Sequence, residues 1–105
     1  MESIDVGTVR RFAEEKMQKV NLFDTERMFC DVYCFEPGQV QRPHVHEGSD
    51  KIYYVLEGRG TFQVGNENRA LSAGMITMAS SGEEHGVVND SGERLVCLVF
   101  MAPHP

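Results

Sequence analysis

Residues 38–58 read GQVQRPHVHEGSDKIYYVLEG, and the fold prediction starts from this stretch. Turn-forming glycine and proline residues bound two stretches rich in valine, isoleucine and tyrosine, and the first of these ends in His44-Val45-His46. Such a composition favours short strands separated by tight turns. Side chains two positions apart in a strand point to the same face of a sheet, so His44 and His46 would project together from one rigid element.

A second stretch, residues 74–89, reads GMITMASSGEEHGVVN and supplies a third histidine, His85. It follows a turn-forming Ser-Ser-Gly sequence and stands at the predicted start of another strand. Neutral imidazole is a good ligand for iron, nickel, copper and zinc. The three histidines are therefore candidate ligands of one metal ion. The alternative that the residues alone leave open is that His44 and His46 are ordinary surface or hydrogen-bonded histidines.

The remainder of the chain predicts a mostly β protein. Stretches rich in β-branched and aromatic residues alternate with turns at an even spacing, which is typical of a sandwich, barrel or jelly roll. The strands are expected near residues 28–36, 40–46, 51–57, 59–64, 69–72, 75–79, 85–89 and 94–101. Before them, apolar residues recur at spacings of three and four, which predicts one short helix over residues 8–20 with Thr8 as its cap.

The two histidine-bearing stretches together resemble the two motifs of the cupin family. The first family motif runs glycine, five residues, His-x-His, three or four residues, glutamate, six residues, glycine. The second runs glycine, five residues, Pro-x-Gly, two residues, histidine, three residues, asparagine. Gly74, Gly82, His85 and Asn89 stand at the spacings of the second motif. The resemblance covers residues 38–89, about half of the chain, and its two motifs occur in the right order.

This resemblance implies an all-β fold, the cupin double-stranded β-helix or jelly-roll barrel, here with a short N-terminal helix. It implies one domain, with an N-terminal arm over residues 1–27 and the barrel over residues 28–102. It also implies one divalent transition metal ion (Fe, Mn, Ni, Zn or Cu) held by His44, His46 and His85. Three histidine ligands would leave coordination positions open for water or substrate, as in catalytic rather than structural sites.

The chain departs from the family pattern at two positions. Ser80 replaces the proline of the second motif, which changes the rigidity of a turn. The family's glutamate is replaced as well: counting six intervening residues back from Gly58 gives Lys51, and counting three intervening residues forward from His46 gives Asp50. A charged lysine cannot ligate a metal. Asp50 is therefore a possible fourth ligand, and the alternative is that it makes only local turn bonds.

Tyr53 shares a strand face with Lys51, and the resemblance implies that this face lines the barrel. Its hydroxyl is a candidate substrate contact, and the alternative is that its ring packs in the barrel wall. The chain has three cysteines, Cys30, Cys34 and Cys97. Because they are odd in number and unevenly spaced, they make a poor disulfide framework. We expect buried, reduced thiols, or else a thiol near the metal.

Composition limits the classes of function. The 105 residues favour one domain, and the net charge of −6 with no basic stripe argues against binding nucleic acid. The chain has no apolar run of membrane-spanning length, and its N-terminus is unlike a signal peptide, so we expect a cytoplasmic protein that binds no membrane. These features leave enzymes and binding proteins for small molecules as the candidate classes.

The leading functional hypothesis is a metal-dependent enzyme, of dioxygenase or isomerase/lyase type, acting on a small organic molecule inside the barrel. A non-catalytic cupin that binds or senses a small ligand is the first alternative, and a metal-stabilised structural protein is the second. Residues 21–36 read as one long, apolar strand with few charges, and an unpaired edge of this kind must be covered. We therefore expect a homodimer built through the N-terminal region, unless the helix folds back and seals this surface within a monomer.

Overall fold

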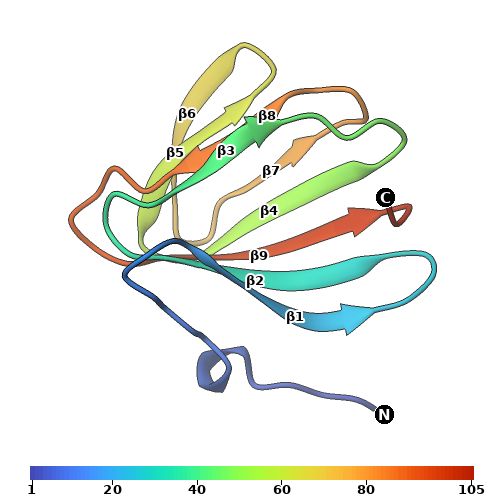
Figure 1. Cartoon of the computed structure of the whole chain (residues 1–105), viewed down its shortest axis with the longest axis horizontal. Coiled ribbons are helices and arrows are strands. Elements are labelled where there is room, and N and C mark those ends of the chain that lie inside the picture. The colour runs from blue at the N-terminus through green and yellow to red at the C-terminus, as the bar shows by residue number, and fades with distance from the viewer.

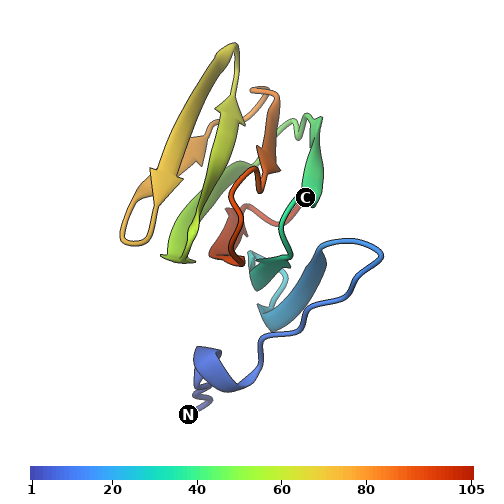
Figure 2. The ribbon, with the colours of Figure 1, turned by 90° about the vertical axis from the view of Figure 1, so that its left-hand side faces the viewer.

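The computed structural model describes all 105 residues and contains two antiparallel sheets that face each other (Figures 1 and 2). The strands are β1 (Gln18–Asp24), β2 (Phe29–Phe35), β3 (Val40–His44), β4 (Asp50–Glu57), β5 (Arg59–Val64), β6 (Glu67–Ser72), β7 (Ile76–Ala79), β8 (His85–Val88) and β9 (Leu95–Ala102). One sheet has the order β1-β2-β9-β4-β7 and the other β3-β8-β5-β6. The predicted all-β jelly-roll barrel is confirmed.

The core lies between the two sheets and follows the period of two expected for half-buried strands. In β4, Lys51, Tyr53 and Val55 are buried, while the residues between them are partly exposed. The inward side chains of five other strands meet this face and form the main apolar cluster: Tyr33, Phe35, Phe62, Leu71, Val87, Leu95, Cys97 and Val99, with Met17 from the N-terminal segment. One fully buried position in this interior is therefore a lysine.

The turns follow the glycine pattern of the sequence, and Gly58 shows why one of these positions needs glycine. It joins β4 to β5 with a φ of 77°, in the region that side chains with a Cβ rarely adopt. A Cβ built there would lie 2.1 Å from the backbone oxygen of Arg94. The glycine that ends the first histidine-bearing stretch is thus required by both conformation and space.

The predicted helix over residues 8–20 is wrong. The only helical element is a 3-10 turn, η1 (Val6–Thr8), whose N-cap Asp5 accepts a hydrogen bond from the backbone NH of Gly7 at 3.0 Å. Irregular chain follows, and β1 begins at Gln18. The apolar spacing of three and four instead reflects contacts with two different parts of the core. Phe12 packs on the cluster of Val32, Cys34 and Val96, whereas Met17 belongs to the main cluster.

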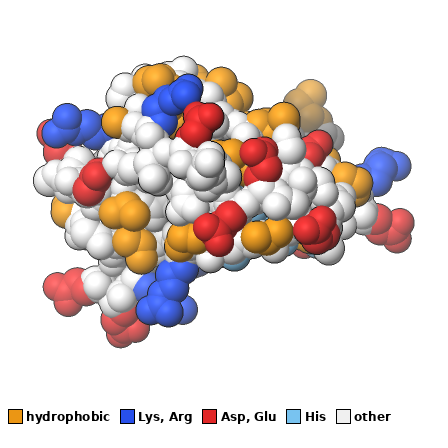
Figure 3. Space-filling view, turned by 90° about the horizontal axis from the view of Figure 1, so that it is seen from above, with side chains coloured by type: hydrophobic (Ala, Val, Ile, Leu, Met, Phe, Trp, Pro, Cys, Tyr) orange, Lys and Arg blue, Asp and Glu red, His pale blue; other side chains and the backbone are white.

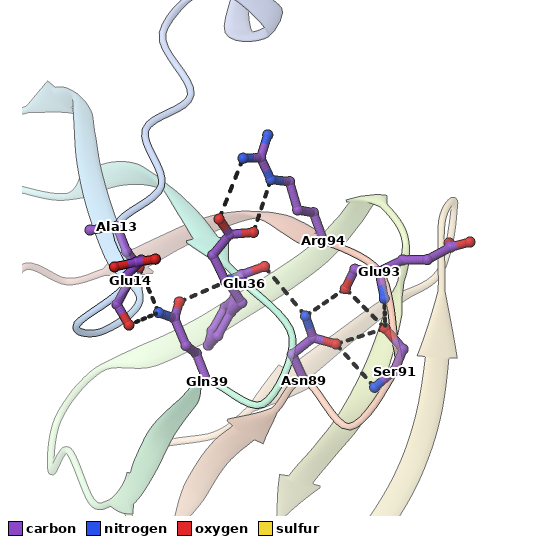
Figure 4. A network of polar contacts seen from close by, with 9 residues as sticks. Ala13, Glu14, Glu36, Gln39, Asn89, Ser91, Glu93 and Arg94 are labelled. Atoms are coloured by element: carbon purple, nitrogen blue, oxygen red, sulfur yellow. Dashed lines mark hydrogen bonds and ion pairs between the residues drawn. The ribbon is translucent and has the colours of Figure 1, made fainter.

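Side chains rather than a helix satisfy part of the backbone in this N-terminal segment (Figure 4). Gln39 donates from Nε2 to the carbonyl oxygen of Ala13 at 2.6 Å, and its Oε1 accepts from the backbone NH of Glu36 at 2.8 Å. Nearby, Asn89 donates to the carbonyl of Phe35 at 3.3 Å and to that of Glu93 at 2.8 Å. The bond from Gln39 to Ala13 holds the N-terminal segment against the barrel, and the bonds of Asn89 brace the barrel beside it; no local sequence pattern reveals the contact between residues 13 and 39.

The expected long strand over residues 21–36 is also two strands, not one. β1 and β2 form a hairpin, and Thr25 closes its turn by accepting hydrogen bonds at Oγ1 from the backbone NH groups of Arg27 and Met28. All three cysteines are free thiols, with Cys34 and Cys97 buried. No helix of the structure has the length and apolar character needed to cross a membrane.

Candidate metal centre

His44, His46 and His85 come together at one end of the barrel. His44 ends β3 and pairs directly with His85, which begins β8, while His46 follows just after β3. The ring centroids lie 4.4 Å apart for His44 and His85, 4.8 Å for His44 and His46, and 5.5 Å for His46 and His85. One nitrogen from each ring lies within 4.8 Å of the others, so the three histidines are positioned to bind one metal ion.

An irregularity in β3 contributes to this geometry. The register between β3 and β8 shifts between Gln41 and His44, in the stretch that contains Pro43. Proline has no backbone NH for a strand ladder and is tolerated here because β3 is an edge strand. Bulges re-aim side chains. The shift thus brings His44 directly opposite His85.

Backbone carbonyls orient two of the three rings. The Nδ1 of His44 lies 2.9 Å from the carbonyl oxygen of Arg42, and the Nδ1 of His85 lies 2.9 Å from that of Glu83. A carbonyl only accepts, so Nδ1 carries the proton in both rings and Nε2 keeps its lone pair. Such contacts fix the tautomer and direction of metal-ligating histidines.

The Nε2 of His85 is buried and has no hydrogen-bond partner in the protein. A buried polar atom without a partner is costly, and such atoms in a folded protein call for a specific explanation. A metal ion bound to Nε2 supplies one, because imidazole nitrogens suit transition metals. The residues present therefore fit the metal that the cupin fold implies.

Burial and a nearby positive charge keep these imidazoles neutral. Burial lowers the pKa of His44, His46 and His85, and for His85 the value is about 4. The charge of Lys51 also acts to lower all three pKa values. Metal ligands must be deprotonated, so the site is ready to bind a cation at neutral pH without first releasing protons.

Lys51 is the unexpected member of this region. Its side chain is only 1% exposed, and its Nζ lies 5.2 Å from the ring centroids of both Tyr33 and Tyr53. The ammonium makes no hydrogen bond or ion pair within the protein. Burial, together with the charge of Lys19, lowers the pKa of Lys51 from 10.5 to about 7, while Asp31 acts in the opposite direction.

Asp50 is placed differently from Lys51. It begins β4 with an exposed side chain, and its Oδ1 accepts a hydrogen bond from the backbone NH of Ser81 at 3.0 Å. The structure does not bring it into the group of three histidines. Lys51, at the next position, faces the interior because neighbouring residues in a strand point to opposite faces. The free thiols do not join the histidine group either.

Tyr53 lies fully buried beside the histidines, with its ring centroid 6.2 Å from that of His85. Its hydroxyl donates to Oε1 of Gln41 at 2.8 Å, and Nε2 of Gln41 donates to the hydroxyl of Tyr33 at 3.4 Å. Neither Gln41 nor Tyr33 was predicted from the sequence. The one sequence feature that could have drawn attention to Gln41 is that it is a polar residue within the strand that leads to His44.

The largest cleft, about 840 Å³, lies between residues 15–19 and 38–42 and is not lined by any of the three histidines. Lys16, Lys19 and Arg42 are among its lining residues, with Glu15 beside them. Gln41 also lines it and bonds to the hydroxyls of Tyr33 and Tyr53. Lys19 also lies 5.2 Å from the ring centroid of Tyr33, on which Lys51 packs. Three basic side chains therefore lie around this cleft, next to the buried tyrosines.

Two facing antiparallel sheets with three convergent histidines at one end define a small β-barrel protein with a candidate metal centre. The family model for the cupin domain matches residues 31–101, about two thirds of the chain, and the chain belongs to the cupin family. The crystal structure of TT1209 from Thermus thermophilus is 47% identical, with a TM-score of 0.97 and full coverage of both chains.

Two further relatives carry more descriptive names. The oxalate-binding protein of Thermotoga maritima is 38% identical over 65 residues, which are 62% of this chain and 54% of that protein. The match thus spans about half of that relative. The structure of KdgF from Halomonas sp. is 27% identical, with a TM-score of 0.81, and the alignment covers all of this chain and 96% of that one.

Proposed function

We propose that the protein is a metal-dependent cupin enzyme that binds one divalent transition metal ion through His44, His46 and His85 and acts on a small organic molecule. The observation that supports this most directly is the buried, unpartnered Nε2 of His85 within a group of three convergent imidazoles. When bound, the metal would supply Lewis acidity or a site for O₂.

The roles of the protein residues follow from their contacts. The carbonyls of Arg42 and Glu83 hold the rings of His44 and His85 with Nε2 toward the metal. The pair of Tyr53 and Gln41 forms a buried polar layer beside the histidines, so it would position the rings and exclude water. The absence of a glutamate from the three-histidine group leaves more coordination positions for a substrate than the family's usual motif would.

The alternative function is binding of a small ligand without turnover. The name of the Thermotoga maritima relative, an oxalate-binding protein, supports this alternative. The two functions share the metal site and differ only in whether the bound molecule is converted.

Elemental analysis of the purified protein tests the shared part of the proposal. We expect about one transition metal ion per chain in the wild type and a clear loss in His85→Ala, while Asp50→Ala serves as a control outside the histidine group. Oxygen consumption and product formation with small phenols, diketones and thiols then test for turnover. Absence of metal after reconstitution with Fe, Mn, Ni, Zn and Cu would contradict the proposal, and metal binding with ligand binding but no turnover would favour the alternative.

A further inference from the structure

Lys51 is a buried amine, cationic when protonated, that the fold places at the metal end of the barrel without giving it an anionic partner. Burying a charge without a partner is expensive, and proteins normally pair such groups. Lys51 is 1% exposed, and its side chain takes part in no hydrogen bond or ion pair. Its only polar compensation comes from the faces of Tyr33 and Tyr53, each 5.2 Å from Nζ.

The position of Lys51 links it to the three histidines through shared neighbours. The ring of Tyr53 lies beside both residues: its centroid is 5.2 Å from Nζ of Lys51 and 6.2 Å from the ring centroid of His85. The pairing of β4 with β7 and β9 fixes the backbone of Lys51 on both sides, opposite Ala79 and Met101. The ammonium is therefore held by a rigid sheet and not by a mobile loop.

Lys51 acts as a positive charge on all three imidazoles and Lys19 on two of them, in a chain whose net charge is −6. Acidic side chains are spread across the outer face shown in Figure 3, whereas Lys51 lies hidden in the interior. Lys19 lies over the same Tyr33 ring as Lys51. Asp31 is the carboxylate whose charge acts on Lys51, and it already accepts a hydrogen bond from Asn21 at 2.8 Å. A divalent metal on the histidines would add further positive charge.

We infer that Lys51 is the anion-binding residue of this site, and that the ligand is a small carboxylate held by the Lys51 ammonium beside the three histidines that would hold the metal. This inference rests on the proposed function, since it assumes the metal. A carboxylate fits because it presents a compact anionic group whose oxygens can accept hydrogen bonds from an ammonium.

The test compares ligand binding by the metal-loaded wild type and two matched variants. Malonate is the probe, malonamide is its neutral analogue, and phosphate is the competing anion. Calorimetry, together with the visible spectrum of the cobalt-substituted protein, reports binding without any need for turnover. Lys51→Met keeps the length of the buried stem, and Lys19→Met removes the same charge from the rim.

We expect Lys51→Met to weaken malonate binding by about 10- to 100-fold, because a hydrogen bond to a charged group is lost. Lys19→Met should weaken it by about threefold at most, in a salt-dependent way. Malonamide should bind weakly and equally to all three proteins. Metal content should be the same in Lys51→Met as in the wild type, because removal of a nearby positive charge does not disfavour a cation.

The outcomes separate this inference from the proposed function. If the wild type binds no metal, both are overturned. If all three proteins bind metal but wild type and Lys51→Met bind malonate equally, only the role of Lys51 is overturned. Tighter binding of phosphate than of malonate, with the same dependence on Lys51, would overturn the assignment to carboxylates.

Discussion

Replacement of Lys51 by methionine should stabilise the metal-free protein. Burial lowers the pKa of Lys51 from 10.5 to about 7, so protonation of this side chain opposes folding at neutral pH. Each pH unit corresponds to about 1.4 kcal/mol, which gives an upper limit of about 5 kcal/mol for this cost. Loss of the two aromatic contacts of the ammonium subtracts about 1–2 kcal/mol, and methionine recovers a part of that through its sulfur. We expect a net gain of about 2–4 kcal/mol at pH 7.

The stability advantage of Lys51→Met over the wild type should decrease as the pH rises. Between pH 7 and about 10 the unfolded chain keeps the proton on Lys51 while the folded protein releases it. The free energy of unfolding of the wild type therefore rises with pH through this window. Lys51→Met lacks the titrating group and lacks this rise. The advantage of the variant should consequently shrink to about 1 kcal/mol or less by pH 10.

Guanidinium unfolding of both proteins at pH 7 and pH 10, with chelator present throughout, measures the effect. Other groups that titrate in this range are common to both proteins and cancel in the difference. Lys19→Met is the matched control, and its stability should stay within about 0.5 kcal/mol of the wild type, as for most surface substitutions. The reasoning is refuted if Lys51→Met gains less than about 1 kcal/mol at pH 7, or if its gain is the same at both pH values.

The contacts around the site and the N-terminal segment predict four other outcomes. Lys51→Glu should tighten metal binding at least about tenfold, because it restores a carboxylate on the inward face of β4. Asp50→Ala should leave the metal affinity within about threefold of the wild type. Metal titration in competition with a chelating dye measures both affinities. Because the pKa of His85 is about 4, chelator should lower the melting temperature at pH 7.5 and still at pH 6, with the difference vanishing near pH 4; an effect already lost at pH 6 would contradict the low pKa. Gln39→Ala should lower the free energy of unfolding by about 1–3 kcal/mol and speed proteolysis within residues 9–17, since it removes the bonds to the carbonyl of Ala13 and the NH of Glu36. We also expect a homodimer formed through the N-terminal region, so sedimentation at micromolar concentration should give twice the mass of 11.8 kDa, and a monomer would contradict it.

The strands were predictable because each carries its own signal. Alternating burial in β4 and the need for glycine at position 58 both follow from local sequence, and β2 to β9 lie within a few residues of the predicted strands. β1 was missed, because its first residues fall in the stretch that was predicted as a helix. The N-terminal segment was not predictable in this way. Its spacing of apolar residues matches a helix, yet Phe12 and Met17 pack on different clusters and Gln39 satisfies the carbonyl of Ala13 from 26 residues away. Tertiary contacts overrode a weak local preference.

Part of the candidate site was likewise predictable from the sequence, and part of it was not. The histidines were found because metal ligation requires a spacing that a strand imposes, and His44 and His46 show it within three residues. Counting forward from His46 leaves both Asp50 and Lys51 open, because the family motif allows three or four residues there, and only the six-residue spacing to Gly58 favours Lys51. The structure resolves it through strand direction: Asp50 turns outward to the backbone NH of Ser81, so Lys51 must turn inward. The family motif has a glutamate carboxylate at the position that Lys51 occupies here. An external carboxylate bound to Lys51 would therefore take the place of the carboxylate that the family motif supplies from the chain itself.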